Sequence, residues 1–139
     1  KHGKEPLGSF RQSSNFRVYF NDTGLFAAKA NIDMWDLKRD GYGRFNAGLI
    51  ENYVAAQLAS EGYELLYWES DGRAGVEFVI HTESGIVPVE VQAAGRQRSR
   101  SLSVYRERYS PGTSFRVSDS NFGIENGIRS ITLYAVFMI

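Results

Sequence analysis

Residues 76–92, VEFVIHTESGIVPVEVQ, decide the fold of this chain of 139 residues. Two runs rich in Val and Ile, Val76 to Thr82 and Ile86 to Ala93, flank the polar turn signal Glu83-Ser84-Gly85. Short β-branched runs on either side of a Gly-containing turn are typical of two antiparallel strands. The stretch therefore predicts a β-hairpin.

The hairpin is expected to carry acids on one face, because successive side chains of a strand point to opposite sides. Val76, Phe78 and Ile80 would share one face, and Glu77, Val79 and His81 the other. If Glu83-Ser84 forms the turn, Glu77 lies across from Glu90; if Ser84-Gly85 does, Glu77 faces Gln92. Adjacent carboxylates repel each other, which favours a hard divalent ion between them. The alternative is a polar face that is simply exposed to solvent.

The segments around this hairpin extend the prediction to an α/β domain. Gly48 to Ser60, rich in good helix formers and followed by Glu61-Gly62, predicts a helix. The order along the central chain is then helix, three strands, helix, strand. The remaining elements expected are strands over 16–20, 63–68, 114–118 and 131–139, a short helix capped at Asn21 to Thr23 and running through Ala30, and a helix over 101–109.

Glu51 is a further candidate acid and lies in the predicted helix Gly48 to Ser60. At 100° per residue it falls on the same side as Val54 and Leu58, within the apolar stripe. A carboxylate facing the protein needs a partner, a proton, a metal ion or the wall of a cleft. Alternatively, Glu51 lies in the first turn and only complements the helix dipole.

Composition limits the other possibilities. Sixteen basic and sixteen acidic residues give zero net charge, and cysteine is absent, so thiol chemistry is excluded. The longest apolar run, Leu133 to Ile139, is too short to span a bilayer, which indicates a soluble cytoplasmic protein without membrane contact. Residues 1–15 are expected to be a flexible segment before a single domain over 16–139, and the ends of the chain suggest a piece excised from a longer protein.

Six short motifs, taken in order, resemble the uncharacterised C-terminal domain of prokaryotic AAA-type ATPases, from about Phe16 to Ile139. That family is identified as a member of the restriction-endonuclease-like superfamily, which implies this fold, with an N-terminal strand and helix and an added C-terminal strand. The motifs are Phe20 to Leu25, Gly48 to Val54, Tyr67-Trp68, Val76 to Ile80, Val87 to Gln92 and Leu133 to Phe137.

The resemblance implies a site for Mg²⁺ or Mn²⁺ and a phosphodiester. Glu51 matches the helix acid, Glu77 the aspartate of the second strand, and Glu90 the acid of the third strand. These three would bind the metal ion, and Gln92 would complete the catalytic set. Gln92, however, stands where lysine is usual and cannot supply a cation. The expected function is a nuclease-like module of an ATPase; the alternative is a catalytically degenerate interaction or DNA-binding domain.

Arg96, Arg98 and Arg100 stand at the start of the helix predicted over 101–109 and are the expected contacts for nucleic acid. A solvated helix face is the alternative explanation for these arginines. The glycines at 43 and 48 have phosphate-loop spacing, but Leu49 follows where lysine is needed, so no nucleotide site is expected here. An ATPase partner would lie upstream in the same chain, and the sequence leaves the oligomeric state open.

Overall fold

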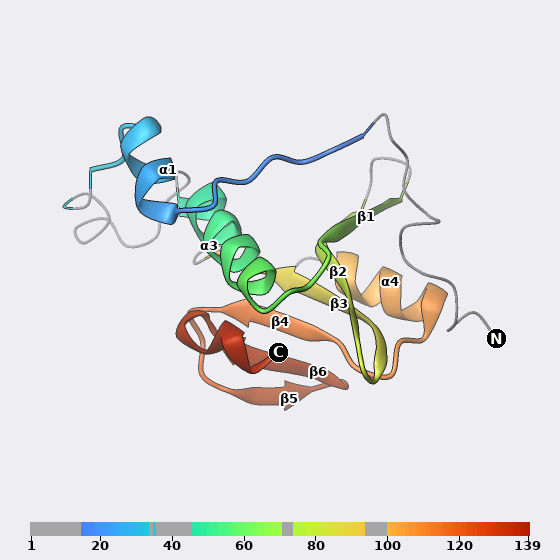
Figure 1. Cartoon of the computed structure of the whole chain (residues 1–139). Helices are drawn as coiled ribbons and strands as arrows, with labels where there is room; N and C mark the ends of the chain where they lie inside the picture. The colour runs from blue at the N-terminus through green and yellow to red at the C-terminus, as the bar shows by residue number, and fades with distance from the viewer. Residues whose placement is uncertain (1–14, 34, 36–45, 71–73, 94–99) are drawn as a thin grey trace.

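A computed structural model describes residues 15–33, 35, 46–70, 74–93 and 100–139. The described chain is mixed α/β, with a six-stranded sheet in the order β1-β2-β3-β4-β6-β5 (Figure 1). The elements are α1 (Thr23–Lys29), α3 (Asn46–Ser60), β1 (Leu66–Ser70), β2 (Ala74–Thr82), β3 (Gly85–Val91), α4 (Ser101–Tyr109), β4 (Phe115–Ser118), β5 (Gly123–Glu125), β6 (Ile128–Thr132) and the 3-10 helix η2 (Leu133–Met138).

The predicted hairpin is confirmed, and so is the order helix, three strands, helix, strand. β1, β2 and β3 run antiparallel, and α4 then carries the chain to β4, which lies parallel to β3. Thr82 pairs with Gly85, so Glu83-Ser84 is the turn and the first of the two registers is correct. The pairing of β2 with β3 runs from there to Phe78 opposite Val89 and does not include Glu77.

The sheet is covered on both faces by apolar side chains. α3 and η2 pack on one face against a core that includes Val54, Leu58, Phe78 and Val89. α4 packs on the other face through Leu102 and Tyr105. Among the described residues, none of the helices combines the length and hydrophobicity needed to cross a bilayer.

The predicted alternation of side chains between the two faces of β2 is wrong at Val76, the first buried residue of the strand. Leu66 pairs with Val79 and Trp68 with Val76, so one residue of β1 faces two residues of β2, Glu77 and Phe78. This extra residue is a β-bulge, which locally resets the alternation. Val76 therefore packs with Val79 on the α4 side, whereas Phe78 packs on the α3 side.

Three other strand predictions need correction. Residues 15–20 are not a strand, because the backbone of Phe20 bonds to the Asn52 side chain instead of a neighbouring strand. The strand expected over 63–68 is β1, which begins at Leu66. The strand expected over 131–139 ends at Thr132, where the chain turns into η2 and packs on α3.

The β5–β6 hairpin was not predicted, although its turn has a clear sequence signal. Glu125 pairs with Ile128, which leaves Asn126 and Gly127 as a two-residue turn. Both have positive φ, 51° and 74°. Asn-Gly is the pair most suited to such a turn, because neither residue is strained there.

Candidate functional site

An extended segment at the start of the described chain, residues 15–20, lies against α3 and is called the strap below. The strap alternates: Phe16 and Val18 are 79% and 77% exposed, whereas Tyr19 packs on the Phe78 ring. The Asn52 side chain, buried at 2% exposure, accepts a hydrogen bond from the Phe20 N–H at 2.7 Å and donates one to the Phe20 carbonyl at 3.1 Å. The strap is thus fixed to α3 at its C-terminal end.

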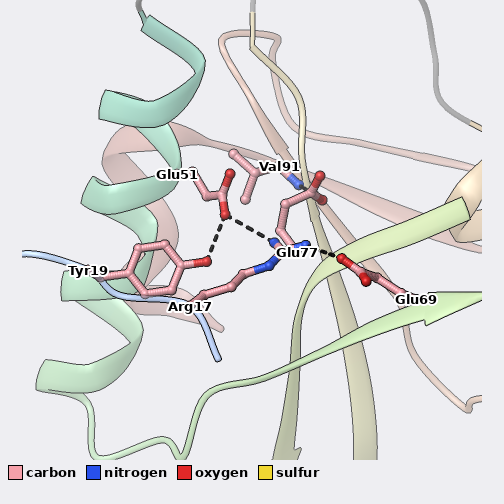
Figure 2. A network of polar contacts seen from close by, with 6 residues as sticks. All are labelled: Arg17, Tyr19, Glu51, Glu69, Glu77 and Val91. Atoms are coloured by element: carbon pink, nitrogen blue, oxygen red, sulfur yellow. Dashed lines mark hydrogen bonds and ion pairs between the residues drawn. The ribbon is translucent and has the colours of Figure 1, made fainter. Parts of the chain in front are cut away.

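Glu51 is bonded to the strap (Figure 2). Its Oε1 accepts hydrogen bonds from the Tyr19 hydroxyl at 2.7 Å and from Arg17 Nη1 at 3.2 Å. Burial and the Glu51 carboxylate both raise the pKa of Tyr19, which keeps its hydroxyl a donor. α3 begins at Asn46, so Glu51 lies beyond the first turn, and the helix-dipole explanation is wrong.

Arg17 connects the strap to the edge of the sheet as well as to α3. Its Nη2 donates to Glu69 Oε1 at 3.1 Å, and its guanidinium lies 4.4 Å from the centre of the Tyr67 ring. The Arg17 side chain remains 30% exposed. One cation therefore spans two carboxylates and an aromatic ring, an arrangement that attracts guanidinium groups.

Glu77 lies at the bulge of β2 and has a different kind of partner. Its Oε2 accepts a hydrogen bond from the Val91 backbone N–H at 3.0 Å. Burial is the main cause that raises the pKa of Glu77, and the charges of Glu51 and Glu90 add to it. Figure 2 shows Glu51 and Glu77 on either side of Val91. The charge of Glu51 thus reaches Glu77, while a common metal site for the three acids stays a prediction.

Glu90 is directed to the opposite side of β3. It alternates with Val89 and Val91, which pack towards α3, and is itself 3% exposed. Its Oε2 accepts a hydrogen bond from Arg116 Nε at 2.8 Å, in an ion pair between paired residues of β3 and β4. Within the described chain, its Oε1 is buried without a hydrogen-bond partner.

Arg116 was not singled out from the sequence. Its signal was an arginine between Phe115 and Val117 in the predicted strand over 114–118, where a buried cation requires a carboxylate. Only the pairing of β4 with β3 identifies that carboxylate as Glu90.

The remaining candidates lie around the end of β3 and the start of α4. Gln92 is half-buried, and its backbone N–H donates to the Val117 carbonyl at 2.8 Å. Arg100 is exposed and immediately precedes α4, whereas Arg96 and Arg98 lie outside the described residues. Considering the described ranges only, no three His, Asp or Glu side chains are grouped so as to hold a metal ion.

A family model described as "Domain of unknown function (DUF4143)" matches residues 47–136. This chain belongs to that family. The match runs from the start of α3 into η2 and includes Glu51, Glu77, Glu90 and Arg116, while the strap precedes it. No curated protein and no solved structure gives a significant match.

The raised pKa of Glu77 predicts how the stability of this DUF4143 domain depends on pH. A carboxyl whose pKa is higher in the folded chain binds its proton more tightly when folded, so stability falls as pH rises above its ordinary value of 4.5. Glu77→Gln should therefore be more stable than wild type at pH 7 and nearly equal to it at pH 4. Urea unfolding at both pH values measures this, and a variant that is less stable at pH 7 would contradict it.

Proposed function

We propose that this domain has a restriction-endonuclease-like scaffold that has lost its cleavage chemistry and works as a nucleic-acid-binding module of an AAA-type ATPase. The order α3, β1 to β3, α4, β4 supports the scaffold, because it is the order that the superfamily's core follows. The parallel pairing of β3 with β4 through α4 is consistent with it.

Two of the three acids already have arginine partners, and this observation is the main support for a loss of cleavage chemistry. Glu51 is bonded to Arg17 and Glu90 to Arg116. A divalent ion bound by these acids would have to displace both guanidinium groups, one of them from a buried ion pair. The acids as arranged therefore do not fit a resident Mg²⁺ or Mn²⁺ ion.

Gln92 adds to the same conclusion. A lysine at this position would stabilise negative charge as a phosphodiester is attacked, whereas the amide of Gln92 is neutral. Loss of one such group costs a factor of about 10² to 10³ in rate. Even with a divalent cation bound at Glu77, phosphodiester cleavage would therefore be slow.

Nucleic-acid binding is supported by exposed arginines around α4. Arg100 at its start and Arg108 in its last turn are both exposed. The net charge of the chain is zero, so attraction for phosphates has to be local. Arg96 and Arg98 would extend this basic stretch.

Binding of labelled single- and double-stranded oligonucleotides, followed by fluorescence anisotropy, tests this function. Arg100→Ala and Arg108→Ala should each weaken binding about three- to tenfold and reduce the salt dependence by about one charge. Lys29→Ala, which removes an exposed cation from α1, is the matched control and should bind as wild type does. Wild-type protein that binds no oligonucleotide at low salt would refute the proposal.

A divalent-metal-dependent phosphodiesterase is the second candidate, and the environment of Glu77 favours it. This carboxylate is largely buried, has two acids nearby, and bonds to a backbone N–H rather than to a described cation. Cleavage of DNA or RNA in Mg²⁺ or Mn²⁺ that disappears in Glu77→Gln would establish this candidate and overturn the loss of chemistry. Cleavage that appears only in Gln92→Lys would identify the natural site as a relic.

A further inference from the structure

We propose that the C-terminal end of α4 binds an unpaired nucleobase, with the Tyr109 ring as its stacking partner and Arg108 and Arg100 as contacts for the flanking phosphates. The nucleic acid preferred here is then single-stranded. This inference rests on the proposed function and deepens it, because it names the form of nucleic acid that the basic stretch around α4 binds.

Three aromatic rings meet between α4 and β1, an outer strand of the sheet (Figure 1). The Trp68 ring lies edge-on to Tyr105 and Tyr109, with ring centres 5.3 and 6.1 Å apart, and the two tyrosine rings are 4.7 Å apart. Trp68 Nε1 donates a hydrogen bond to the Tyr109 hydroxyl at 3.2 Å. These contacts hold the Tyr109 ring in one orientation.

This aromatic cluster is buried at one end and open to solvent at the other. Tyr105 is 5% exposed and packs in the core with Leu102, whereas Tyr109 is 49% exposed. In the part of the chain that the structure describes, the sheet ends at β1, so no further strand covers Tyr109. An exposed ring that its neighbours already hold loses little conformational freedom when a ligand packs on it.

Positive charge surrounds this ring, which favours a polyanion over an uncharged partner. Arg108 is exposed, and its Cζ lies 5.5 Å from the centre of the Tyr109 ring. Arg100 is exposed as well and, at 1.5 Å per residue, lies about 12 Å away from Arg108 along the helix. Residues 100–109 carry three arginines, the third being Arg106, against one acid, Glu107, in a chain whose net charge is zero.

Stacking on Tyr109 selects single strands, because both faces of a paired base are covered by its neighbours in a duplex. An unpaired base can pack on the exposed ring, and the Arg108 guanidinium beside it can turn to a phosphate of the same strand. Aromatic stacking combined with arginine contacts to the backbone is sequence-tolerant, since every base has an aromatic face. The expected ligand is therefore single-stranded DNA or RNA with little sequence preference.

Fluorescence anisotropy with a labelled single-stranded oligothymidylate and with a duplex of the same length tests this preference. Wild type should bind the single strand more tightly. Tyr109→Ala should weaken single-strand binding at least about fivefold, since one base–aromatic stack is lost, and should leave duplex binding unchanged. Tyr109→Phe keeps the ring and should stay within about twofold of wild type. Tyr134→Ala, which truncates a tyrosine 71% exposed on η2, is the matched control and should bind as wild type does.

Tyr109→Leu and an abasic oligonucleotide provide a second test. Leucine keeps apolar volume beside Trp68 but has no aromatic face, so it should weaken single-strand binding as alanine does. The abasic strand keeps its phosphates and should bind wild type and Tyr109→Ala equally; circular dichroism checks that each variant is folded. Single-strand affinity unchanged in both the alanine and leucine variants, or tighter binding of wild type to the duplex, overturns the stacking proposal and leaves the proposed function intact. Wild type that binds neither oligonucleotide at low salt contradicts the proposed function instead.

Discussion

Arg116→Met is expected to lower the free energy of unfolding by about 3–5 kcal/mol, because it leaves the Glu90 carboxylate buried without its cation. Glu90 is 3% exposed, and the Arg116 side chain 10%, so water cannot replace the lost partner easily. Methionine keeps most of the aliphatic volume of the arginine side chain, so the lost stability measures the effect of the missing charge rather than that of a cavity. Urea unfolding at pH 7 measures it.

The double variant Glu90→Gln/Arg116→Met tests whether the loss of stability comes from the broken ion pair or from changed packing. It should recover much of the lost stability, because no uncompensated charge remains. Arg108→Met is the matched control, since Arg108 is exposed on α4 and should change stability by less than about 0.5 kcal/mol. A loss below about 1 kcal/mol in Arg116→Met would show that the buried pair does not exist as described.

Phe78→Ala is expected to cost about 3–5 kcal/mol, the range for truncating a buried phenylalanine. Phe78 is 1% exposed, lies in the bulge of β2, and packs on Tyr19 of the strap with ring centres 5.6 Å apart. The variant should therefore also loosen the strap. Urea unfolding reports the first effect, and faster hydrogen exchange at the Phe20 amide, which Asn52 protects, reports the second.

Phe137→Ala is the control for this result. Phe137 is 59% exposed on η2, so the same truncation there should change stability by less than about 0.5 kcal/mol. Equal losses in the two variants would contradict the packing of Phe78 between β2 and the strap. An unchanged Phe20 exchange rate in Phe78→Ala would contradict its role in holding the strap.

Local sequence patterns predicted much of this fold. The hairpin over 76–92, the helix ending at Ser60 and the helix over 101–109 follow from residue propensities and turn signals, which act within a few residues. The Asp22 side chain caps α1 by accepting from the Leu25 N–H, as the cap chemistry of that segment predicted. Asn126-Gly127 was an equally local signal for a hairpin.

The candidate site depended on features that local patterns do not contain. Glu77, whose pKa is affected by the charge of Glu51, lies in a bulge, and strict alternation cannot predict this extra residue. Arg116 meets Glu90 only because β4 pairs with β3 across 26 residues of sequence. The local pattern predicts that Arg17 and Tyr19 belong to a strand, but contacts with α3 determine their conformation.

In this structure arginines of the chain balance two of the candidate acids, Arg17 at Glu51 and Arg116 at Glu90. Anomalous diffraction from wild-type crystals soaked in MnCl₂ would test whether these pairs exclude a metal ion, because the map shows both the ion and the side chains. No Mn²⁺ peak is expected beside Glu51 or Glu77, and Arg17 should still be bonded to Glu51 and Arg116 to Glu90. A Mn²⁺ peak coordinated by Glu77 together with Glu51 or Glu90 would contradict this expectation.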